Sequence, residues 1–261
     1  MCIAVFIWQS HPLYPLLLLL NRDEYHTRPT TAAGWWEGGE ILGGRDELGG
    51  GTWLACSKNG RLSFLTNFRE IDSLPQSKSR GELPVRFLQS EKGPTEFAEE
   101  IIQEADRYNG FNLVVADLHS KSMVYITNRP KENKPSFLHV SSGTHVLTNA
   151  SLDTLWPKAE RLLGNFKEMM ETYGESEVEV HEIVEKLMTD TTKHETLQGI
   201  LSPHFEHHLS SIFVNIDNTP DGRYGTRSTS VVLAKTSGEV CFHERYLVAD
   251  HWKEHMITYQ I

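Results

Sequence analysis

Two runs of apolar residues open the chain. Residues 2–8 and 16–20 carry apolar side chains throughout, and the polar segment 9–12 separates them. Uninterrupted apolar runs of this length are typical of strands buried on both faces, so the pattern predicts two buried strands joined by a turn around Pro12. Both runs are far shorter than the 18 or so apolar residues of a membrane-spanning helix, and no basic segment precedes them. The pattern argues against a signal peptide and against a transmembrane segment.

Hydrophobic periodicity and turn signals predict the remaining elements. Strands are expected near 41–43, 51–56, 61–67, 111–117, 122–128, 143–149, 211–216, 229–235 and 239–248. Helices are expected near 83–90, 95–107, 152–173 and 178–189, the second of which opens after Pro94. Asn59-Gly60 between two apolar runs predicts a hairpin. Residues 72–80 and 129–135 are expected to be loops.

The order of these elements indicates the fold class. Blocks of strands alternate with pairs of helices, whereas a doubly wound parallel sheet needs a helix after almost every strand. The pattern predicts an α+β protein with two layers of antiparallel sheet, covered by helices on both sides. The chain shows no internal repeat and no long linker, so residues 1–261 are expected to form a single domain.

Composition and charge exclude several classes of protein. The chain has 261 residues, of which 39% are hydrophobic, and this is enough to build a sizeable core. Its net charge of -10 has the wrong sign for a protein that follows a phosphate backbone, so nucleic acid is not an expected partner. Three cysteines are a small and odd number for a secreted disulfide framework, which favours a reducing compartment.

The thiol of Cys2 directly follows the initiator methionine. Removal of Met1 would leave Cys2 with both a thiol and a free α-amine, which together provide a nucleophile and a base. The alternative is that Cys2 is a small apolar residue that opens a buried strand, because free cysteine is among the most buried residue types. The position of the residue does not separate the two interpretations.

A short polar sequence, Asn21-Arg22-Asp23-Glu24, ends the leucine run. Cys2 and Arg22 are expected on neighbouring strands of one hairpin, which would bring Arg22 or Asp23 to the start of the chain. There a carboxylate would hold an α-ammonium, and a guanidinium would lower the pKa of a thiol. The alternative is that these charged groups are solvated or paired with each other at a strand end.

Three further polar residues lie at the ends of predicted strands. Asn67 and Asn149 each close a Leu-Thr-Asn sequence, and an amide at such a place is able to donate to an oxyanion without titrating. Asn is also a routine turn residue, so either one alone carries little weight. Arg227 precedes the strand near 229–235 and offers a guanidinium to a carboxylate or phosphate.

The glycine-rich segment 43–53 is not a phosphate-binding loop. Its residues 49–50 are Gly-Gly where such a loop has Gly-Lys, and no strong helix follows. Tight turns between close-packed strands are the expected use of these glycines.

The histidines raise the question of a metal site. The candidates are His204, His207 and His208, and the pair His251 and His255 at a spacing of four. Residue 252 is Trp where the zinc motif has Glu, and no further ligand is spaced to complete a site, so no metal is predicted. The sequence also lacks the Cys-x-x-Cys-His motif of covalently attached haem.

Seven motifs follow one another along residues 1–235. They are Met1-Cys2, Asn21-Arg22-Asp23-Glu24, Gly43-Gly44-Arg45-Asp46, Gly51-Thr52-Trp53-Leu54, Thr66-Asn67-Phe68, Thr148-Asn149 and Tyr224-Gly225-Thr226-Arg227. In this order they resemble the transport-and-Golgi-organisation family, also called the NRDE family. The pattern of that family is in turn similar to N-terminal-nucleophile (Ntn) hydrolases of the choloylglycine and penicillin V acylase type. This similarity implies a four-layer αββα sandwich.

The wider resemblance implies roles for individual residues. Cys2 would be the nucleophile and, through its α-amine, the base. The residues implied at the acyl site are Cys2, Arg22, Asp23, Asn67, Asn149 and Arg227. The residues implied to contact the ligand are Asn21, Glu24, Arg45 and Trp53. In those acylases the Arg and the Asp are usually separated by two residues, whereas here they are adjacent, so either Asp23 or Glu24 is expected to meet the α-amine.

Two functions from different classes agree with these residues. The first is hydrolysis of an amide or thioester by the Cys2 thiolate, with Asn149 and a backbone N–H holding the oxyanion. The second is a non-catalytic carrier, in which Arg22 and Arg227 bind acidic groups of the ligand. Trp35, Trp36 and Trp53 would then line the apolar part of the cleft or belong to the core.

The resemblance also implies the kind of ligand and the location. Family members are implicated in haem mobilisation, in acyl-coenzyme A and lipid metabolism, and in secretory-pathway organisation, which implies a small amphipathic ligand. Neither function requires a cofactor, and haem or acyl-coenzyme A would be a transient ligand. A cytoplasmic location is expected, with mitochondrion and Golgi as alternatives, while the oligomeric state and the identity of the ligand stay open.

Overall fold

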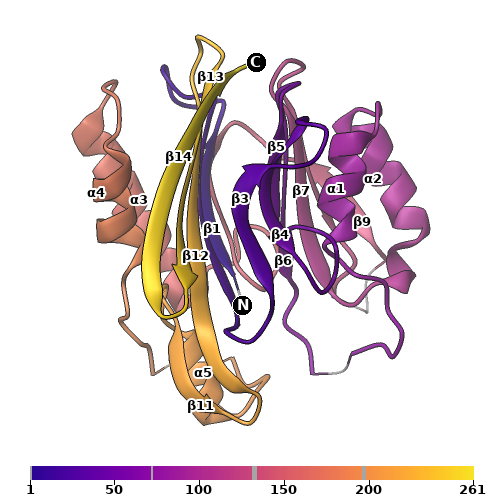
Figure 1. Ribbon diagram of the computed structural model, residues 1–261, viewed down its shortest axis with the longest axis vertical. Coiled ribbons are helices and arrows are strands. Elements are labelled where there is room, and N and C mark those ends of the chain that lie inside the picture. Colours follow the sequence, from indigo (N-terminus) through magenta and orange to yellow (C-terminus); the bar gives the residue numbers. More distant parts are fainter. Residues whose placement is uncertain (1, 72, 131–133, 196–197) are drawn as a thin grey trace. The chain divides into compact units, whose positions relative to one another are not determined.

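The computed structural model describes residues 2–71, 73–130, 134–195 and 198–261. The chain divides into two compact units (Figure 1). The first unit comprises Met1–Thr27, Ser142–Thr148 and Leu152–Gln260, and the second comprises Arg28–Ser141, Asn149–Ser151 and Ile261. Along the sequence, the second unit is therefore an insertion into the first.

The first unit is built on a seven-stranded antiparallel sheet. Its strands are β1 (Ile3–Trp8), β2 (Leu16–Tyr25), β10 (Gly143–Leu147), β11 (Asn215–Thr219), β12 (Gly222–Ala234), β13 (Glu239–Val248) and β14 (His251–Gln260). They lie in the order β10-β1-β2-β12-β13-β14, and β11 pairs with β12. The N-terminal hairpin is thus central in the sheet, and its β2 strand pairs with a strand from the far end of the chain.

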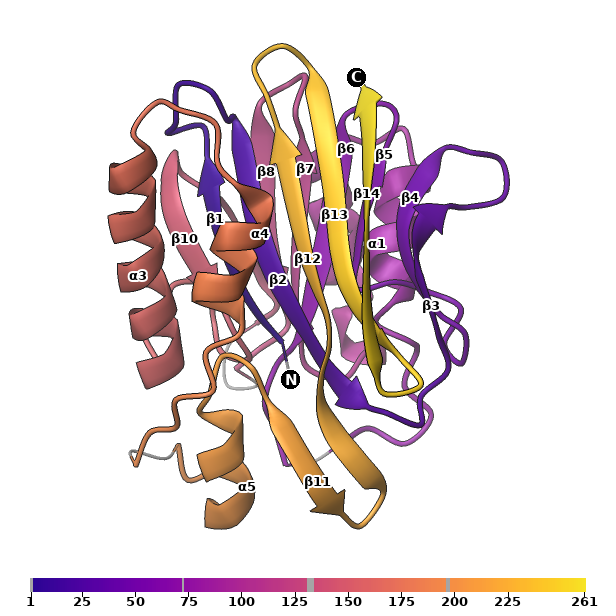
Figure 2. The ribbon, with the colours of Figure 1, turned by 60° about the vertical axis from the view of Figure 1, so that its left-hand side comes forward.

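Helices lie over one face of this sheet (Figure 2). They are α3 (Pro157–Tyr173), α4 (Val180–Ile183) and the π-helical turn η2 (Val184–Met188), while α5 (Pro203–Leu209) packs near β11. Ile3 and Val5 of β1 and Leu19 of β2 are fully buried on this face, in one cluster with Leu162 and Phe166 of α3. All six residues of β1 are buried, as expected of an uninterrupted apolar strand.

The second unit is built on another seven-stranded antiparallel sheet, in which each strand neighbours the next along the chain. The strands are β3 (Thr30–Trp35), β4 (Ile41–Asp46), β5 (Leu54–Ser57), β6 (Arg61–Asn67), β7 (Phe111–Asp117), β8 (Ser122–Thr127) and β9 (Ser136–His139). The predicted hairpin between β5 and β6 turns at Gly60, whose φ of +68° is readily adopted only by glycine.

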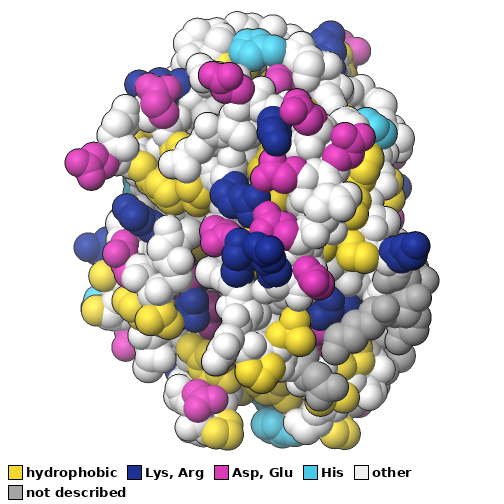
Figure 3. Space-filling model, turned by 90° about the vertical axis from the view of Figure 1, so that its right-hand side faces the viewer, with side chains coloured by type: hydrophobic (Ala, Val, Ile, Leu, Met, Phe, Trp, Pro, Cys, Tyr) yellow, Lys and Arg dark blue, Asp and Glu magenta, His cyan; other side chains and the backbone are white. Residues whose placement is uncertain are grey.

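Two amphipathic helices cover this second sheet. They are α1 (Glu82–Gln89) and α2 (Pro94–Gln103), followed by the short turn η1 (Ala105–Arg107). Phe87 and Phe97 are buried in one cluster with Leu113 of β7. The outer side of the helices carries alternating charges, such as Arg86 between Glu100 and Glu104, and Figure 3 shows basic and acidic side chains together on that face. Partly exposed pairs of this kind add at most about 1 kcal/mol each.

The predicted α+β class with two antiparallel sheets is confirmed. The pattern did not anticipate β3, β9, β14 or α5. The sequence Asn21-Arg22-Asp23-Glu24 does not follow the strand as predicted but lies inside β2, because β12 pairs with β2 as far as Tyr25. Within the predicted loops, residue 72 and residues 131–133 lie outside the described residues.

Across the described ranges, no helix combines the length and the apolar character that crossing a bilayer requires.

Candidate active site at the first hairpin

The pairing of β1 with β2 places the thiol of Cys2. The register pairs Ile3 with Asn21 and Ala4 with Leu20, so its continuation sets Cys2 opposite Arg22. Cys2 is 8% exposed, and Arg22 and Asp23 are 5% exposed each. The structure therefore brings these three predicted residues together in a buried environment.

The surroundings of the sulfur act on its pKa in opposite directions. Burial is the largest influence and raises the pKa of the Cys2 thiol, and the negative charge of Asp23 raises it further. A hydrogen bond from the backbone N–H of Asp23 and the positive charge of Arg22 lower it. The net effect is a raised pKa, so the thiol stays protonated at neutral pH unless a base takes its proton.

The Asp23 carboxyl accepts a hydrogen bond from β12 and lies within the electrostatic influence of buried cations. Thr226 Oγ1 donates to Asp23 Oδ1 at 2.7 Å, and Thr226 Oγ1 itself accepts from the backbone N–H of Val214 at 2.9 Å. Burial raises the pKa of the Asp23 carboxyl, while the charges of Lys158 and Arg22 lower it without cancelling that effect. Asp23, not Glu24, is thus the buried carboxylate of the motif beside Cys2.

Lys158 is a buried cation that the sequence reasoning missed. It lies in the first turn of α3 and is 2% exposed, and its charge acts on Asp23. A lysine at a helix start is normally solvated. The available signal was its spacing, because Lys158 precedes Leu162, Phe166 and Met170 at intervals of four on the buried face of the helix.

Arg227 is the extra residue of a β-bulge. Asp23 pairs with Thr226 and Arg22 with Ser228, so Arg227 has no opposite residue on β2. Bulges re-aim a side chain and are frequent beside active sites. Arg227 Nη1 donates to the carbonyl of Tyr25 at 3.2 Å. Burial, followed by the Arg22 charge, lowers the pKa of Arg227.

A cavity of about 390 Å³ extends from Arg227. The residues that line it are His26, Thr27, Arg223, Arg227, Leu247, Ala249 and Asp250. Arg223 is already paired, since its Nη1 lies 3.0 Å from Asp250. Burial, followed by the charges of Arg223 and Arg227, lowers the pKa of His26. The cavity joins cationic groups to the apolar Leu247, and sequence reasoning anticipated only Arg227 among its lining residues.

Asn21 and Glu24, both predicted to contact a ligand, bond within the protein. Asn21 Nδ2 donates to the carbonyls of Met188 (2.8 Å) and Ile212 (3.1 Å). Asn21 Oδ1 accepts from Thr229 Oγ1 at 2.6 Å, so the amide joins β2 to its surroundings on the helix-covered side. Glu24 Oε1 accepts the backbone N–H of Tyr25 at 2.9 Å.

Asn67 and Asn149 belong to the second unit, where they lie next to each other. Asn149 Nδ2 donates to the carbonyl of Asn67 at 2.7 Å, and the backbone N–H of Arg69 donates to the carbonyl of Asn149 at 2.7 Å. Asn149 is fully buried, and within the described residues nothing donates to its Oδ1. Asn67 is exposed. Their assignment to an oxyanion site stays a prediction.

Arg45 and Trp53 also lie in the second unit. Arg45 is exposed, with its guanidinium 5.0 Å from the ring centroid of Trp36. Trp53 is 7% exposed, and a Cβ on Gly44 would come within 2.4 Å of its ring. The glycine therefore lets the indole lie directly on β4, which agrees with the expected use of glycine for close packing of strands.

Comparisons with known proteins decide the family. The sequence profile described as transport and Golgi organisation 2 matches residues 1–249. The chain belongs to the transport and Golgi organisation 2 family. A mouse transport and Golgi organization 2 homolog is 32% identical over 262 residues, covering 95% of this chain and 94% of the relative. The human homolog is 31% identical over 272 residues, covering 97% and 96%.

A solved structure shares the fold of this family member. The C2A mutant of a conjugated bile acid hydrolase from Clostridium perfringens superposes with a TM-score of 0.51 at 10% identity. The match covers 99% of this chain and 97% of that one. The resemblance noted in the sequence is thereby confirmed for the transport and Golgi organisation 2 family and for the Ntn-hydrolase fold.

Proposed function

We propose that this chain is a thiol hydrolase that cleaves an amide or thioester of a small amphipathic substrate through Cys2. The observation that carries the proposal is the register of the first hairpin. It sets Cys2 opposite Arg22, and the backbone N–H of Asp23 donates a hydrogen bond to the Cys2 thiol. The likeness in fold to a conjugated bile acid hydrolase supports the same class of chemistry.

The proposed mechanism requires removal of Met1. Because burial raises the pKa of the Cys2 thiol, a neighbouring base has to accept its proton. The α-amine that Met1 removal exposes titrates near 7.7–8.0 and is attached to the same residue. Asp23, which is 5% exposed, would in its ionised form hold the resulting ammonium close to the sulfur.

The proposed reaction has two stages. The thiolate attacks the substrate carbonyl, and the C–N or C–S bond breaks as the α-ammonium passes its proton to the leaving amine or thiol. Water, which loses a proton to the α-amine, then attacks the acyl-cysteine thioester. This step releases the acid and restores the thiol.

An intact-mass experiment tests the hydrolase. Protein purified from its own cells is expected to lack Met1 and, after treatment with a p-nitrophenyl acyl ester, to carry one acyl group on Cys2. The Cys2→Ser variant should lose the adduct, because serine in this site lacks the acidity of a thiol. Cys241→Ser is the matched control: Cys241 is more exposed than Cys2, so nonspecific acylation would favour it. Retained Met1 with no adduct would contradict the proposal.

The cavity beside Arg227 favours a second candidate, a non-catalytic carrier. Its guanidinium would bind the carboxylate or phosphate of an amphipathic ligand, with Leu247 against the apolar part. Haem and acyl-coenzyme A are ligands of this chemistry. The carrier requires neither Met1 removal nor the Cys2 thiol.

Binding of palmitoyl-coenzyme A, measured by calorimetry, tests the carrier. Arg227→Gln is expected to weaken binding about tenfold or more, because a charge-assisted hydrogen bond is lost. Arg245→Gln is the control, since its guanidinium lies 5.0 Å from the Trp252 ring centroid and does not line the cavity. Equal affinities of Arg227→Gln and the unmodified protein would contradict the carrier, and binding that survives in Cys2→Ser would separate it from the hydrolase.

A further inference from the structure

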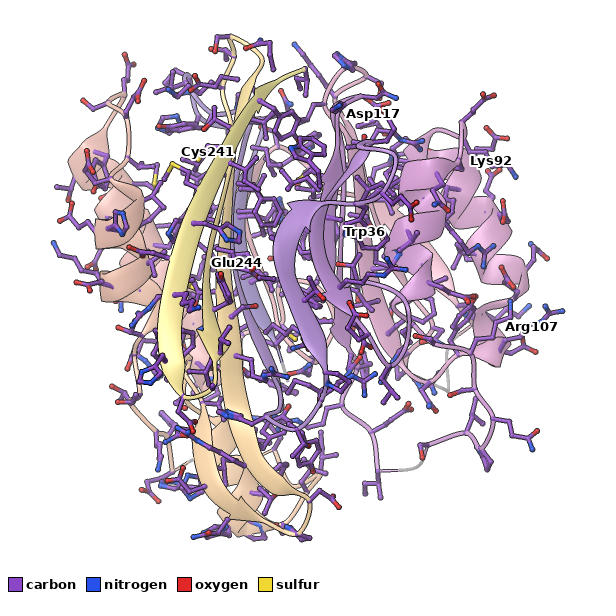
Figure 4. The ribbon with its side chains drawn as sticks, in the orientation of Figure 1. Trp36, Lys92, Arg107, Asp117, Cys241 and Glu244 are labelled. Carbon is purple, nitrogen blue, oxygen red and sulfur yellow. The ribbon has the colours of Figure 1, made fainter. Side chains whose placement is uncertain are left out.

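Three potential metal ligands meet on the helix-covered side of the first sheet, away from the first hairpin. They are His181 of α4, His243 of β13 and Glu254 of β14. His243 pairs with Met256, so Glu254, two residues earlier on β14, projects to the same face as a diagonal neighbour. Figure 4 labels Cys241 and Glu244 of β13, the strand to which His243 belongs.

The spacing of the three side chains suits a tetrahedral ion. One ligand atom from each residue lies within 4.8 Å of the other two. Glu254 Oε2 is 3.4 Å from His181 Nδ1 and 3.6 Å from His243 Nε2. Neighbouring ligand atoms in a tetrahedral zinc site, with bonds of about 2.0–2.1 Å, are about 3.3 Å apart. The two distances from Glu254 Oε2 therefore lie within a few tenths of an ångström of the tetrahedral value, and the ligand nitrogens of His181 and His243 are at most 4.8 Å apart.

His243 supplies a second, independent observation. His243 is only 2% exposed. Within the described residues, neither of its ring nitrogens has a hydrogen-bond partner. A buried polar group without a partner is costly, and natural proteins rarely retain one without a reason. An ion bound to Nε2 would satisfy this imidazole.

The charge state of the site also suits a cation. In its neutral form each imidazole offers a ring nitrogen with a lone pair to a metal. Glu254 supplies one negative charge. Two imidazoles and one carboxylate form a ligand set typical of zinc sites with an open fourth position.

We propose that His181, His243 and Glu254 bind a divalent transition-metal ion, with Zn²⁺ the best match, and leave one coordination position to solvent. His181 and Glu254 have side-chain exposures of 63% and 50%, so an ion reaches the site from solution and water completes its shell. The three residues come from one helix and two strands, which is why no spacing motif in the sequence revealed them.

Zinc titration against a chromogenic chelator tests the site in the full-length protein. The unmodified chain is expected to bind one equivalent, and His181→Ala is expected to weaken binding by about 100-fold or more, since even outer-shell changes cost 10–100-fold. His181 is exposed, so its removal leaves the core intact. Glu254→Gln should weaken binding in the same direction while keeping the size of the side chain.

His251→Ala is the matched control. His251 is an exposed imidazole on the same strand, but it stands three residues from Glu254 and therefore projects to the opposite face. Its removal should leave the affinity unchanged. Zn²⁺ should also raise the melting temperature of the unmodified chain and of His251→Ala, and not that of His181→Ala.

Cobalt substitution gives a readout that depends on geometry. Co²⁺ bound by two imidazoles, a carboxylate and water should show the strong visible absorption of tetrahedral Co²⁺, and Glu254→Gln should weaken or shift it. The proposal is overturned if the unmodified chain binds no equivalent of Zn²⁺. It is equally overturned if His181→Ala and Glu254→Gln bind as tightly as the control.

Discussion

A buried carboxylate beside the Cys2 thiol costs the folded protein stability. Burial raises the pKa of Asp23 above its usual value, so the folded state favours the protonated form. A raised folded pKa gives stability that is complete below the unfolded pKa of about 3.9 and is lost as the pH rises through the folded value. At a pH above the folded value, where Asp23 is ionised, the fold therefore carries an electrostatic cost, as functional sites often do.

Asp23→Asn is expected to stabilise the protein at pH 7. The amide keeps an oxygen for Thr226 and removes the buried charge, so the melting temperature should rise by about 2–4 °C, the effect of roughly 1 kcal/mol in a chain of this size. The gain should vanish as the pH falls towards 4. Thermal unfolding followed by circular dichroism across this range measures it.

Asp190→Asn should show the opposite sign. Despite the opposing effect of burial, hydrogen bonds to Thr192 and Arg161 lower the pKa of Asp190, so its stabilisation is present above the unfolded pKa and is lost in acid. Its substitution should lower the melting temperature at pH 7. Equal effects of the two substitutions would contradict the assignment of a buried, costly charge to Asp23.

At this scale the sequence allowed Cys2, Arg22 and Asp23 to be grouped, because a hairpin fixes which residues face each other. It did not reveal Lys158, since a helix start usually exposes a lysine and only the pairing of α3 with the sheet shows that this one is buried. Nor did it reveal His243 as a potential metal ligand, because only tertiary folding brings His181 and Glu254 to it.

At the scale of elements, Asn21 fixes the strand that carries the motif. Its amide makes three hydrogen bonds from a fully buried position in the middle of β2. A polar side chain in a leucine strand would be costly without these partners. Its bonds to Met188 and Ile212 therefore explain how an apolar strand continues into a polar segment.

Asn21→Ala is expected to lower the free energy of unfolding by about 3 kcal/mol, because it leaves buried carbonyls and the Thr229 hydroxyl without a donor or acceptor. Urea denaturation measures the loss. Asn165→Ala, on the exposed side of α3, should change stability by less than about 0.5 kcal/mol. Similar losses in both variants would argue against a structural role for the Asn21 amide.

Prediction of the elements succeeded where apolar residues mark them and missed three strands at the edges of the sheets. β3 and β9 are edge strands of the second sheet, and β14 is an edge strand of the first. Exposed edges tolerate charged and polar residues, which weakens the alternating pattern. The spacing of four between His251 and His255, which suits one face of a helix, falls on the strand β14.

At the scale of the whole molecule, the fold class was predictable because strand blocks and helix pairs alternate along the chain. The division into two compact units was not. The second unit is inserted after Thr27 and the chain returns to the first at Ser142, so no single linker of distinct composition marks a boundary. The family profile spans both units, since it extends from residue 1 to residue 249.

The pairing of β2 with β12 has a consequence during synthesis. Asp23 and its partner Thr226 are 203 residues apart in the chain. A ribosome adding 5–20 residues per second needs about 10–40 s to make the intervening segment. During that interval β2 lacks its partner strand β12. The proposed removal of Met1 by an aminopeptidase would therefore take place before the sheet closes over Cys2.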